Sequence, residues 1–220
     1  MNSPPLIKRV RFAAPRGVNP APLAAVALLL TVLSSGCATA SLPPPAGIAA
    51  RAREALSYRA RLRVSLKGPG VRARTAALVA FRRPDGLRIE VPGPTGPRLL
   101  AVARGGRLAA VFPSERAVYA GNARAGELQA LLGVALEPAE VMDLLVGVPS
   151  SRLRSYRAVW GPAMPRRIEA TLPDGGKIKV TVEEAEAGAA LSEAAFAEPR
   201  HEGYRAVDAD EARSLWSGGR

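Results

Sequence analysis

Several residue types are nearly missing from this 220-residue sequence, and each shortage argues against a class of chemistry. There is one cysteine, Cys37, and one histidine, His201, which lies in a polar segment near the C-terminus. So few ligands and nucleophiles argue against zinc sites, Cys/His catalysis and histidine-based triads. No glycine-rich phosphate loop follows a strand, because Gly105-Gly106 is typical of a hairpin turn. We therefore expect a protein that is not an enzyme and that uses no cofactor and no metal ion.

Acidic residues are also few, 19 against 31 basic ones, which gives a net charge of +12. The basic residues are interleaved singly along strand-like segments, without the aromatic platform that binds single-stranded nucleic acid, and no nucleic-acid partner is expected. An anionic phospholipid surface attracts nearby Lys and Arg by roughly 1 kcal/mol each. It is therefore the partner we favour over nucleic acid. The alternative that stays open is that arginine simply replaces lysine in a GC-rich genome.

The sequence has no apolar run long enough for a spanning helix, since residues 21–33 supply about 13 residues and a span needs roughly 20. Residues 1–20 carry four basic residues and no acid, and small residues precede Cys37. This pattern is typical of a secretory signal peptide. The cysteine resembles that of a bacterial lipobox, although Ser34 stands where leucine is typical. We expect residues 1–36 to be removed; the alternative is an ordinary signal peptide with an incidental cysteine.

The lipobox resemblance implies that Cys37 is the lipid attachment site, with a diacylglycerol anchor that includes palmitate-like chains. Two or three acyl chains hold a protein stably on a bilayer where one chain does not. Ala38 follows the cysteine, and by resemblance to the sorting rule of enteric bacteria this implies the periplasmic face of the outer membrane. Residues 37–47 would form the lipidated N-terminus and a stiff proline-rich tether. Removal of residues 1–36 would leave 184 residues with a net charge of +8, a length that suits one domain.

Short segments of alternating polarity dominate the mature chain. Residues 58–67 alternate for ten positions, and residues 71–81 repeat the pattern after a Gly-Pro-Gly turn. Residues 92–97 contain three prolines, so we predict a projecting loop there and not a strand. Further strands are predicted at residues 87–91, 98–104, 107–112, 116–121, 152–160, 166–172 and 177–183. Several short strands with regular turns are typical of an antiparallel barrel or sandwich.

Between residues 126 and 146 the apolar residues recur at spacings of three and four, which predicts two helices. The first is expected to break at Gly133 and the second to restart near Glu137-Pro138, because proline is favoured at the first helical position. Glu137, Glu140 and Asp143 recur every three residues, and we interpret them as a solvated helix face in preference to a metal site. Other helices are predicted at residues 48–57 and 208–216, whereas residues 184–207 fit no single pattern.

A curved sheet interrupted by two apolar helices predicts a hollow that the helices cover, and barrels of this size can enclose one apolar ligand. An ordinary filled core stays open as the alternative, because alternation defines a face without saying which face points inward. If the hollow exists, the expected lining residues are Leu62, Val64, Leu66, Val79, Phe81, Ile89, Val111, Leu128, Leu131, Leu132, Leu144 and Leu145.

Most of the mature chain resembles LolB, the outer-membrane lipoprotein receptor. The resemblance lies in a Pro-x-Gly loop (Pro94-Thr95-Gly96), the helical sequence Leu131-Leu132-Gly133-Val134-Ala135-Leu136, and the sequence Leu144 to Pro149. It continues through Met164-Pro165 and a hairpin with Asp174-Gly175-Gly176. The resemblance implies a half-open antiparallel β-barrel of about 9–11 strands covered by a helical lid. This barrel would occupy residues 48–207, followed by a C-terminal helix or tail at residues 208–220.

The resemblance further implies a function without bond chemistry. A LolB-like protein takes acylated lipoprotein cargo from a LolA-like periplasmic carrier into its apolar hollow and delivers it to outer-membrane phospholipid. A monomer is expected. Pro94, Thr95 and Gly96 would form the membrane-insertion loop, but Thr95 stands where the family has leucine, and its hydroxyl makes insertion less favourable. Two alternatives stay open: a LolA-superfamily carrier of another lipid, and a ligand-free envelope scaffold lipoprotein.

Overall fold

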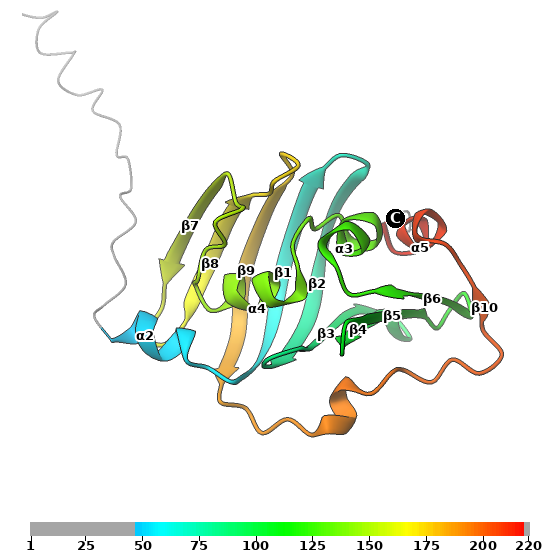
Figure 1. Ribbon diagram of the computed structural model, residues 1–220, viewed down its shortest axis with the longest axis horizontal. Helices are drawn as coiled ribbons and strands as arrows, with labels where there is room; N and C mark the ends of the chain where they lie inside the picture. The colour runs from blue at the N-terminus through cyan, green and yellow to red at the C-terminus, as the bar shows by residue number, and fades with distance from the viewer. Residues whose placement is uncertain (1–46, 218–220) are drawn as a thin grey trace, which may run out of the picture. The chain divides into compact units, whose positions relative to one another are not determined.

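The computed structural model describes residues 47–217, in which ten strands form one sheet (Figure 1). The strands are β1 (Ser57–Gly68), β2 (Val71–Arg82), β3 (Gly86–Gly93), β4 (Gly96–Arg104), β5 (Arg107–Phe112), β6 (Ala117–Asn122), β7 (Ser155–Trp160), β8 (Pro165–Thr171), β9 (Lys177–Ala187) and β10 (Arg205–Ala206). Their order is β10-β6-β5-β4-β3-β2-β1-β9-β8-β7. All neighbours pair antiparallel except β10 and β6, which are parallel. The sheet is open, and the predicted half-open antiparallel architecture is confirmed.

The described residues 47–217 belong to one compact unit that contains every described element and the whole described core. The expected signal peptide, Cys37 and the expected tether up to residue 46 lie outside the described residues. None of the helices in residues 47–217 is long and apolar enough to cross a membrane.

Alternating polarity places the two sides of each long strand in different surroundings. β1 and β2 pair along their whole length, from Ser57 opposite Arg82 to Gly68 opposite Val71. Leu62 and Leu66 are buried on one face, whereas Arg63 between them is exposed on the other. A strand with one dry and one wet face has this period-two pattern.

Within residues 47–217, four α-helices and one short 3-10 helix accompany the sheet: α2 (Ile48–Arg53), α3 (Ala125–Leu132), α4 (Pro138–Leu145), η1 (Glu193–Phe196) and α5 (Ala209–Ser217). α3 and α4 lie over the concave face of the sheet, and α5 lies beside α3 (Figure 1). The predicted break is confirmed, since Gly133 adopts a left-handed conformation (φ 72°) directly after α3. The predicted start is also confirmed, because Pro138 is the first residue of α4.

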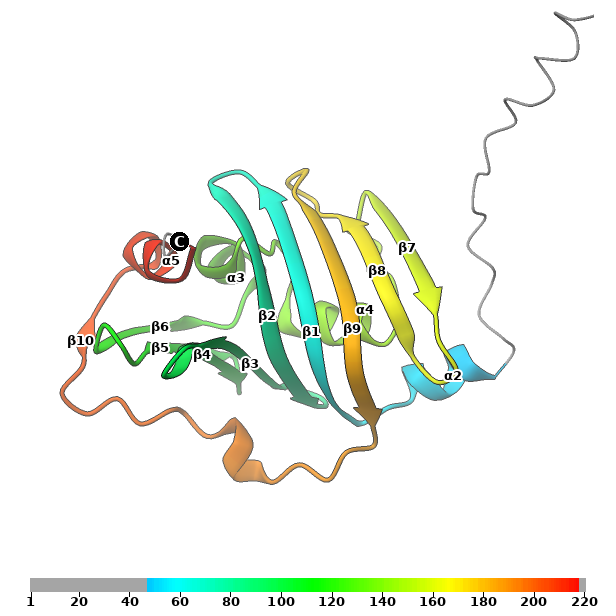
Figure 2. The same cartoon turned by 180° about the vertical axis from the view of Figure 1, so that it is seen from behind.

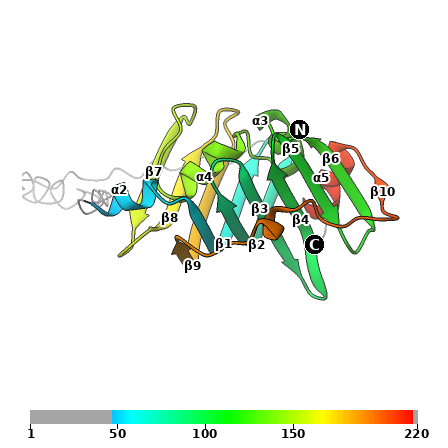
Figure 3. The ribbon, with the colours of Figure 1, turned by 60° about the horizontal axis from the view of Figure 1, so that its bottom comes forward.

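Two expectations about local structure are wrong. The helix predicted over residues 48–57 ends at Arg53, because Ser57 already begins β1. The loop predicted over residues 92–97 is a tight hairpin, in which β3 continues through Pro92 and only residues 94–95 form the turn. A shift in register between Val91 and Pro92 accommodates the proline, which cannot donate to the strand ladder. Figure 3 shows that this hairpin still projects beyond its neighbours.

Residues 188–204, which fitted no single pattern in the sequence, run along the outer side of the sheet (Figure 2). Their η1 turn packs against β3 and β4. Phe196 is buried there, and Arg88 on β3 donates a hydrogen bond of 3.2 Å to the Ala195 carbonyl oxygen. This segment therefore covers part of the outer face of the sheet, with η1 over β3 and β4, and it returns the chain to β10 and α5.

Candidate ligand cavity

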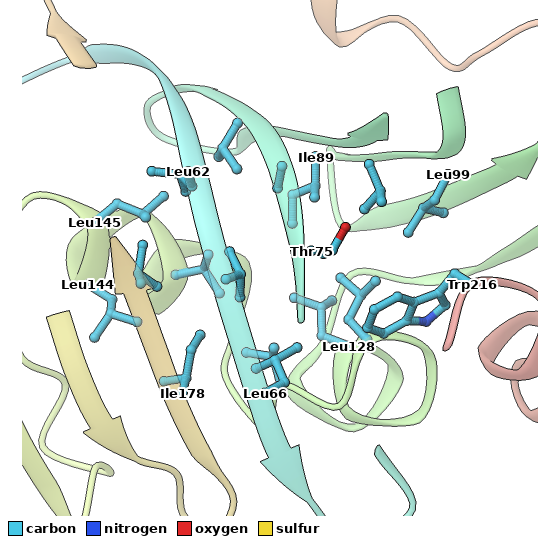
Figure 4. Close-up of a pocket in the computed structure, with 18 residues that line it drawn as sticks. Leu62, Leu66, Thr75, Ile89, Leu99, Leu128, Leu144, Leu145, Ile178 and Trp216 are labelled. Carbon is cyan, nitrogen blue, oxygen red and sulfur yellow. The ribbon is translucent and has the colours of Figure 1, made fainter. Parts of the chain in front are cut away.

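A cavity of about 90 Å³ lies between the concave face of the sheet and the helices α3, α4 and α5 (Figure 4). Strands β1, β2, β3, β4 and β9 supply one wall, and the helices supply the other. The lining residues are Leu62, Val64, Leu66, Thr75, Ala77, Val79, Ile89, Val91, Leu99, Leu128, Leu132, Val134, Val141, Leu144, Leu145, Ile178, Val180 and Trp216. None of them is ionisable, so the wall offers a ligand no charge.

The structure brings together nine of the twelve residues expected to line a hollow. These nine are Leu62, Val64, Leu66, Val79, Ile89, Leu128, Leu132, Leu144 and Leu145. They come from three strands and two helices that span 84 positions of the sequence. The shared face exists because the inward positions of β1, β2 and β3 lie directly opposite one another in register, as Leu62 does with Ala77.

Phe81, Val111 and Leu131 do not line the cavity, although all three are buried. Phe81 is at the far end of β2, where it stacks on Tyr58 with 5.2 Å between ring centroids. Val111 points to the outer face of the sheet, because its β5 neighbours Ala110 and Phe112 take the core side. Leu131 belongs to the core, but the cavity-facing positions of α3 are Leu128 and Leu132, which are one turn apart.

Sequence reasoning missed lining residues of two kinds. Ile178 and Val180 alternate along β9, and Ala77 lies between Thr75 and Val79 on β2, so a complete reading of the alternation could have found them. Trp216 carries no such signal, because α5 follows a long irregular segment and only the tertiary fold brings it to the cavity.

The two polar side chains in the wall have their polar atoms engaged by backbone groups. The Thr75 hydroxyl donates a 3.0 Å hydrogen bond to the Ala76 carbonyl oxygen. The Trp216 indole N–H donates a 2.6 Å hydrogen bond to the Leu131 carbonyl oxygen. With those groups satisfied, the accessible wall is entirely apolar. Such a wall offers water no hydrogen-bond partner and favours hydrocarbon.

Polar contacts on the outer side of α4 hold this helix over the cavity. The Glu137 backbone N–H donates a 2.8 Å hydrogen bond to the Glu140 side chain, which also accepts from Ser150 and, at 3.0 Å, from Arg152. Arg83, in the turn between β2 and β3, pairs with Asp143 at 2.6 Å. The acidic residues of α4 therefore have structural partners. In residues 47–217 no cluster of three or more His, Cys, Asp or Glu side chains could hold a metal ion.

The structure places the expected membrane-insertion residues at the tip of the β3–β4 hairpin. Pro94, Thr95 and Gly96 are all exposed. The turn is tight because Gly93 pairs with Gly96, and a Cβ atom at Gly93 would lie 2.9 Å from the Gly96 carbonyl oxygen. The tip thus presents one threonine side chain and a proline ring, and it does not line the cavity.

Comparison with known proteins gives matches to solved structures only. No protein-family model matches the chain, and no curated protein sequence matches it. An uncharacterized conserved protein from Thermus thermophilus is similar at 12% identity and a TM-score of 0.42, over 73% of this chain and 96% of that one. A LolA superfamily protein from Nitrosomonas europaea is similar at 12% identity and a TM-score of 0.41, over 68% of this chain and 95% of that one. The basis for a function is therefore the cavity of this chain.

Proposed function

We propose that this protein binds acyl chains in the cavity, and that it acts as a LolB-like receptor for acylated lipoproteins. In this role it takes the cargo from a LolA-like periplasmic carrier and passes it to the inner leaflet of the outer membrane, where the Cys37 lipid would anchor the receptor. The observation that carries the proposal is the cavity itself, whose accessible wall is hydrocarbon from five strands and three helices. Burying a methylene group there is worth about 0.8 kcal/mol.

The volume of the cavity indicates that the helices must move for a long chain to bind. Ligand pockets generally have volumes of about 300–1,000 Å³, and this cavity has about 90 Å³. α4 is held by its buried side chains Met142, Leu144 and Leu145 and by polar contacts, among which the Arg83–Asp143 pair is partly exposed to solvent, with side chains 23% and 36% accessible. Such a pair contributes about 1 kcal/mol or less. The burial of a dozen methylene groups, at about 0.8 kcal/mol each, more than offsets its loss.

The first test measures uptake of a fluorescent fatty acid by a form of the protein that begins at residue 38. The wild-type form is expected to bind it, and Ala77→Leu is expected to weaken binding at least tenfold, because the added carbons fill the cavity. Ala76→Leu is the matched control. Ala76 is next to Ala77 in the sequence but is exposed on the other face of β2, so this substitution should leave binding unchanged. Equal binding by both variants would contradict a ligand site in the cavity.

The second test mixes the same form with a LolA–lipoprotein complex and measures by pull-down whether the lipoprotein is transferred from LolA to this protein. Transfer is the expected result. If the protein binds fatty acid but takes no lipoprotein, it is a carrier of another lipid. If it is folded and binds neither, the small cavity volume favours a ligand-free scaffold as the function.

The hairpin tip separates cargo capture from cargo delivery. Thr95→Leu restores the side chain that the family has at this exposed position, and a leucine enters lipid more readily than a threonine because it has no hydroxyl to desolvate. We expect faster delivery of lipoprotein to liposomes with no change in capture. An unchanged delivery rate would remove the hairpin from the delivery step.

A further inference from the structure

The outer face of the sheet, which points away from the cavity, is divided into two regions of different charge. One region, here named the basic face, comprises eight exposed side chains on β1, β2, β7, β8 and β9 near the β1–β2 turn: Arg63, Lys67, Arg72, Arg74, Arg157, Arg167, Lys177 and Lys179. Two acids, Glu169 and Glu183, lie among them in ion pairs with Lys179 and Arg63. The basic face therefore carries a net charge of about +6.

The other region, towards the start of β1, has nearly balanced charge and serves as an internal comparison. Its basic residues are Arg59, Arg61, Arg82, Arg88 and Arg104, and its acids are Glu90, Glu184, Glu186 and Glu193. The pairs are close, with Arg59 at 2.7 Å from Glu186 and Arg82 at 2.5 Å from Glu193. Excess positive charge is thus a property of one region of the outer face and not of the whole face.

Like charges face each other across the strands of the basic face. Lys67 on β1 lies directly opposite Arg72 on β2 and Lys177 on β9. In the part of the chain that the structure describes, Lys67, Arg72, Arg74 and Lys177 have no acidic partner within ion-pairing distance. Directly opposed like charges destabilise a sheet. An arrangement that lowers the stability of the fold calls for an anionic partner that neutralises it.

The surroundings of Glu169 report the same positive field. A hydrogen bond from Lys179 is the largest influence on the pKa of Glu169; burial tends to raise this pKa, but the hydrogen bond and the charges of Lys179, Arg167 and Arg157 together hold it below its ordinary value. An acid placed in this region is therefore stabilised in its charged form, as a bound anion would be.

The side chains between the charges distinguish among anionic partners. Most outward positions between these charges are small, such as Ser65, Ala76 and Thr181; Val159 on β7 is a larger exposed apolar side chain, and no outward position of these five strands is aromatic. Protein interfaces rely on aromatic anchors at their centre, and single-stranded nucleic acid requires stacking platforms. Long, flexible Lys and Arg side chains spread over several strands suit a layer of phospholipid headgroups, which attracts each of them independently. Figure 2 shows these strands uncovered by any described helix.

We propose that the basic face docks on an anionic phospholipid bilayer and holds the sheet against the headgroups, so that the cavity side, with α3 and α4, points away from the lipid. This orientation leaves the cavity accessible to a soluble partner. The docking does not depend on what the cavity binds, because the two faces use different side chains of the same strands.

The experiment measures co-sedimentation with vesicles of the form that begins at residue 38, which lacks the anchor and keeps the whole compact unit. Vesicles of pure phosphatidylcholine are compared with vesicles that contain about 30% phosphatidylglycerol, at low salt and at about 0.5 M salt, where charges are strongly screened. The expected result is binding to the phosphatidylglycerol vesicles at low salt, with little binding in the other conditions.

Two triple variants locate the binding surface. Lys67→Gln, Arg72→Gln and Lys177→Gln together are expected to weaken vesicle binding about 100-fold, at about fivefold for each basic residue. The control combines Arg59→Gln, Arg61→Gln and Arg82→Gln, which removes the same three charges from the balanced region and should change binding less than threefold. Thermal unfolding followed by circular dichroism monitors the fold, and the first variant should not unfold earlier than the wild type, because it relieves repulsion.

Three outcomes would overturn the proposal. The first is that the wild-type form fails to bind phosphatidylglycerol vesicles. The second is that both triple variants lose binding equally, which would make the net charge of the protein the cause. The third is that poly-glutamate or a DNA duplex displaces the protein from the vesicles at equal charge concentration, which would indicate a different partner. Fatty-acid uptake by the same samples reports on the cavity separately, so that failure of docking and failure of the proposed function are distinguishable.

Discussion

The two faces of the central strands have opposite chemistry although they are built from alternating residues of the same segments. Leu62 is 1% exposed and lines the cavity, whereas its neighbour Arg63 is exposed on the basic face. The cavity wall on the inner face has no ionisable side chain, whereas the outer face carries many. Strand alternation in this protein therefore separates an apolar surface from a charged one by the thickness of one sheet, with no extra element between them.

The largest expected effect comes from moving charge to the wrong face. Leu62→Glu buries a carboxylate without a partner, and we expect the free energy of unfolding to fall by about 4 kcal/mol or more. Arg63→Glu introduces the same side chain on the exposed face, where it breaks only the solvent-exposed pair with Glu183, and should change that free energy by about 1 kcal/mol or less. Urea denaturation measures both. Similar losses in the two variants would contradict the assignment of the faces.

A smaller effect is expected from thinning the helical wall of the cavity. Leu145→Ala removes a buried side chain of α4 and should lower the free energy of unfolding by about 3 kcal/mol. Leu56→Ala is the matched control, because Leu56 is 72% exposed and should lose almost nothing. Chemical denaturation again provides the measurement, and equal losses would show that α4 does not pack as described.

The start of α4 predicts a pH dependence. Burial tends to raise the pKa of Glu140, but hydrogen bonds from Ser150, the Glu137 N–H and Arg152 outweigh it and hold the pKa below the ordinary value of 4.5. This stabilisation is complete above pH 4.5 and is lost as the pH falls through the lowered pKa. Glu140→Ala should therefore cost about 1 kcal/mol at pH 7, and the difference from wild type should shrink towards pH 3. Thermal unfolding across that range tests the trend, and a constant difference would contradict it.

The smallest effect is a gain in stability on the outer face. Lys67→Gln removes the repulsion from Arg72 and Lys177, and we expect the free energy of unfolding to rise by about 0.5 kcal/mol. Arg61→Gln, from the balanced region opposite Glu184, should not raise it. The gain should disappear in high salt, where exposed charges are screened. A loss of stability in Lys67→Gln would mean that the opposed charges do not repel.

Local patterns predicted the fold well where residues follow a clear period. The β1 and β2 alternation and the break at Gly133 appear in the structure close to their predicted positions. The loop predicted over residues 92–97 was wrong because the prediction relied on proline content. A register shift allows Pro92 to stay on the strand. The prediction that Val111 lines the cavity was wrong because a buried valine on a covered outer face has the same alternation pattern in the sequence as a valine in the core. Trp216 was missed because only long-range packing brings α5 to the cavity.

The hydrocarbon wall of the cavity also determines what kind of selectivity this protein can have. Hydrogen bonds discriminate because they have direction and a missing partner is costly, whereas apolar contacts sum over area and tolerate sliding. With Thr75 and Trp216 already engaged by backbone carbonyls, the wall has no such directional group to offer. If the cavity binds an acyl chain as we propose, its affinity depends on how much of the chain is buried and not on which molecule the chain belongs to. Recognition of a particular cargo would then come from parts of that cargo that stay outside the cavity.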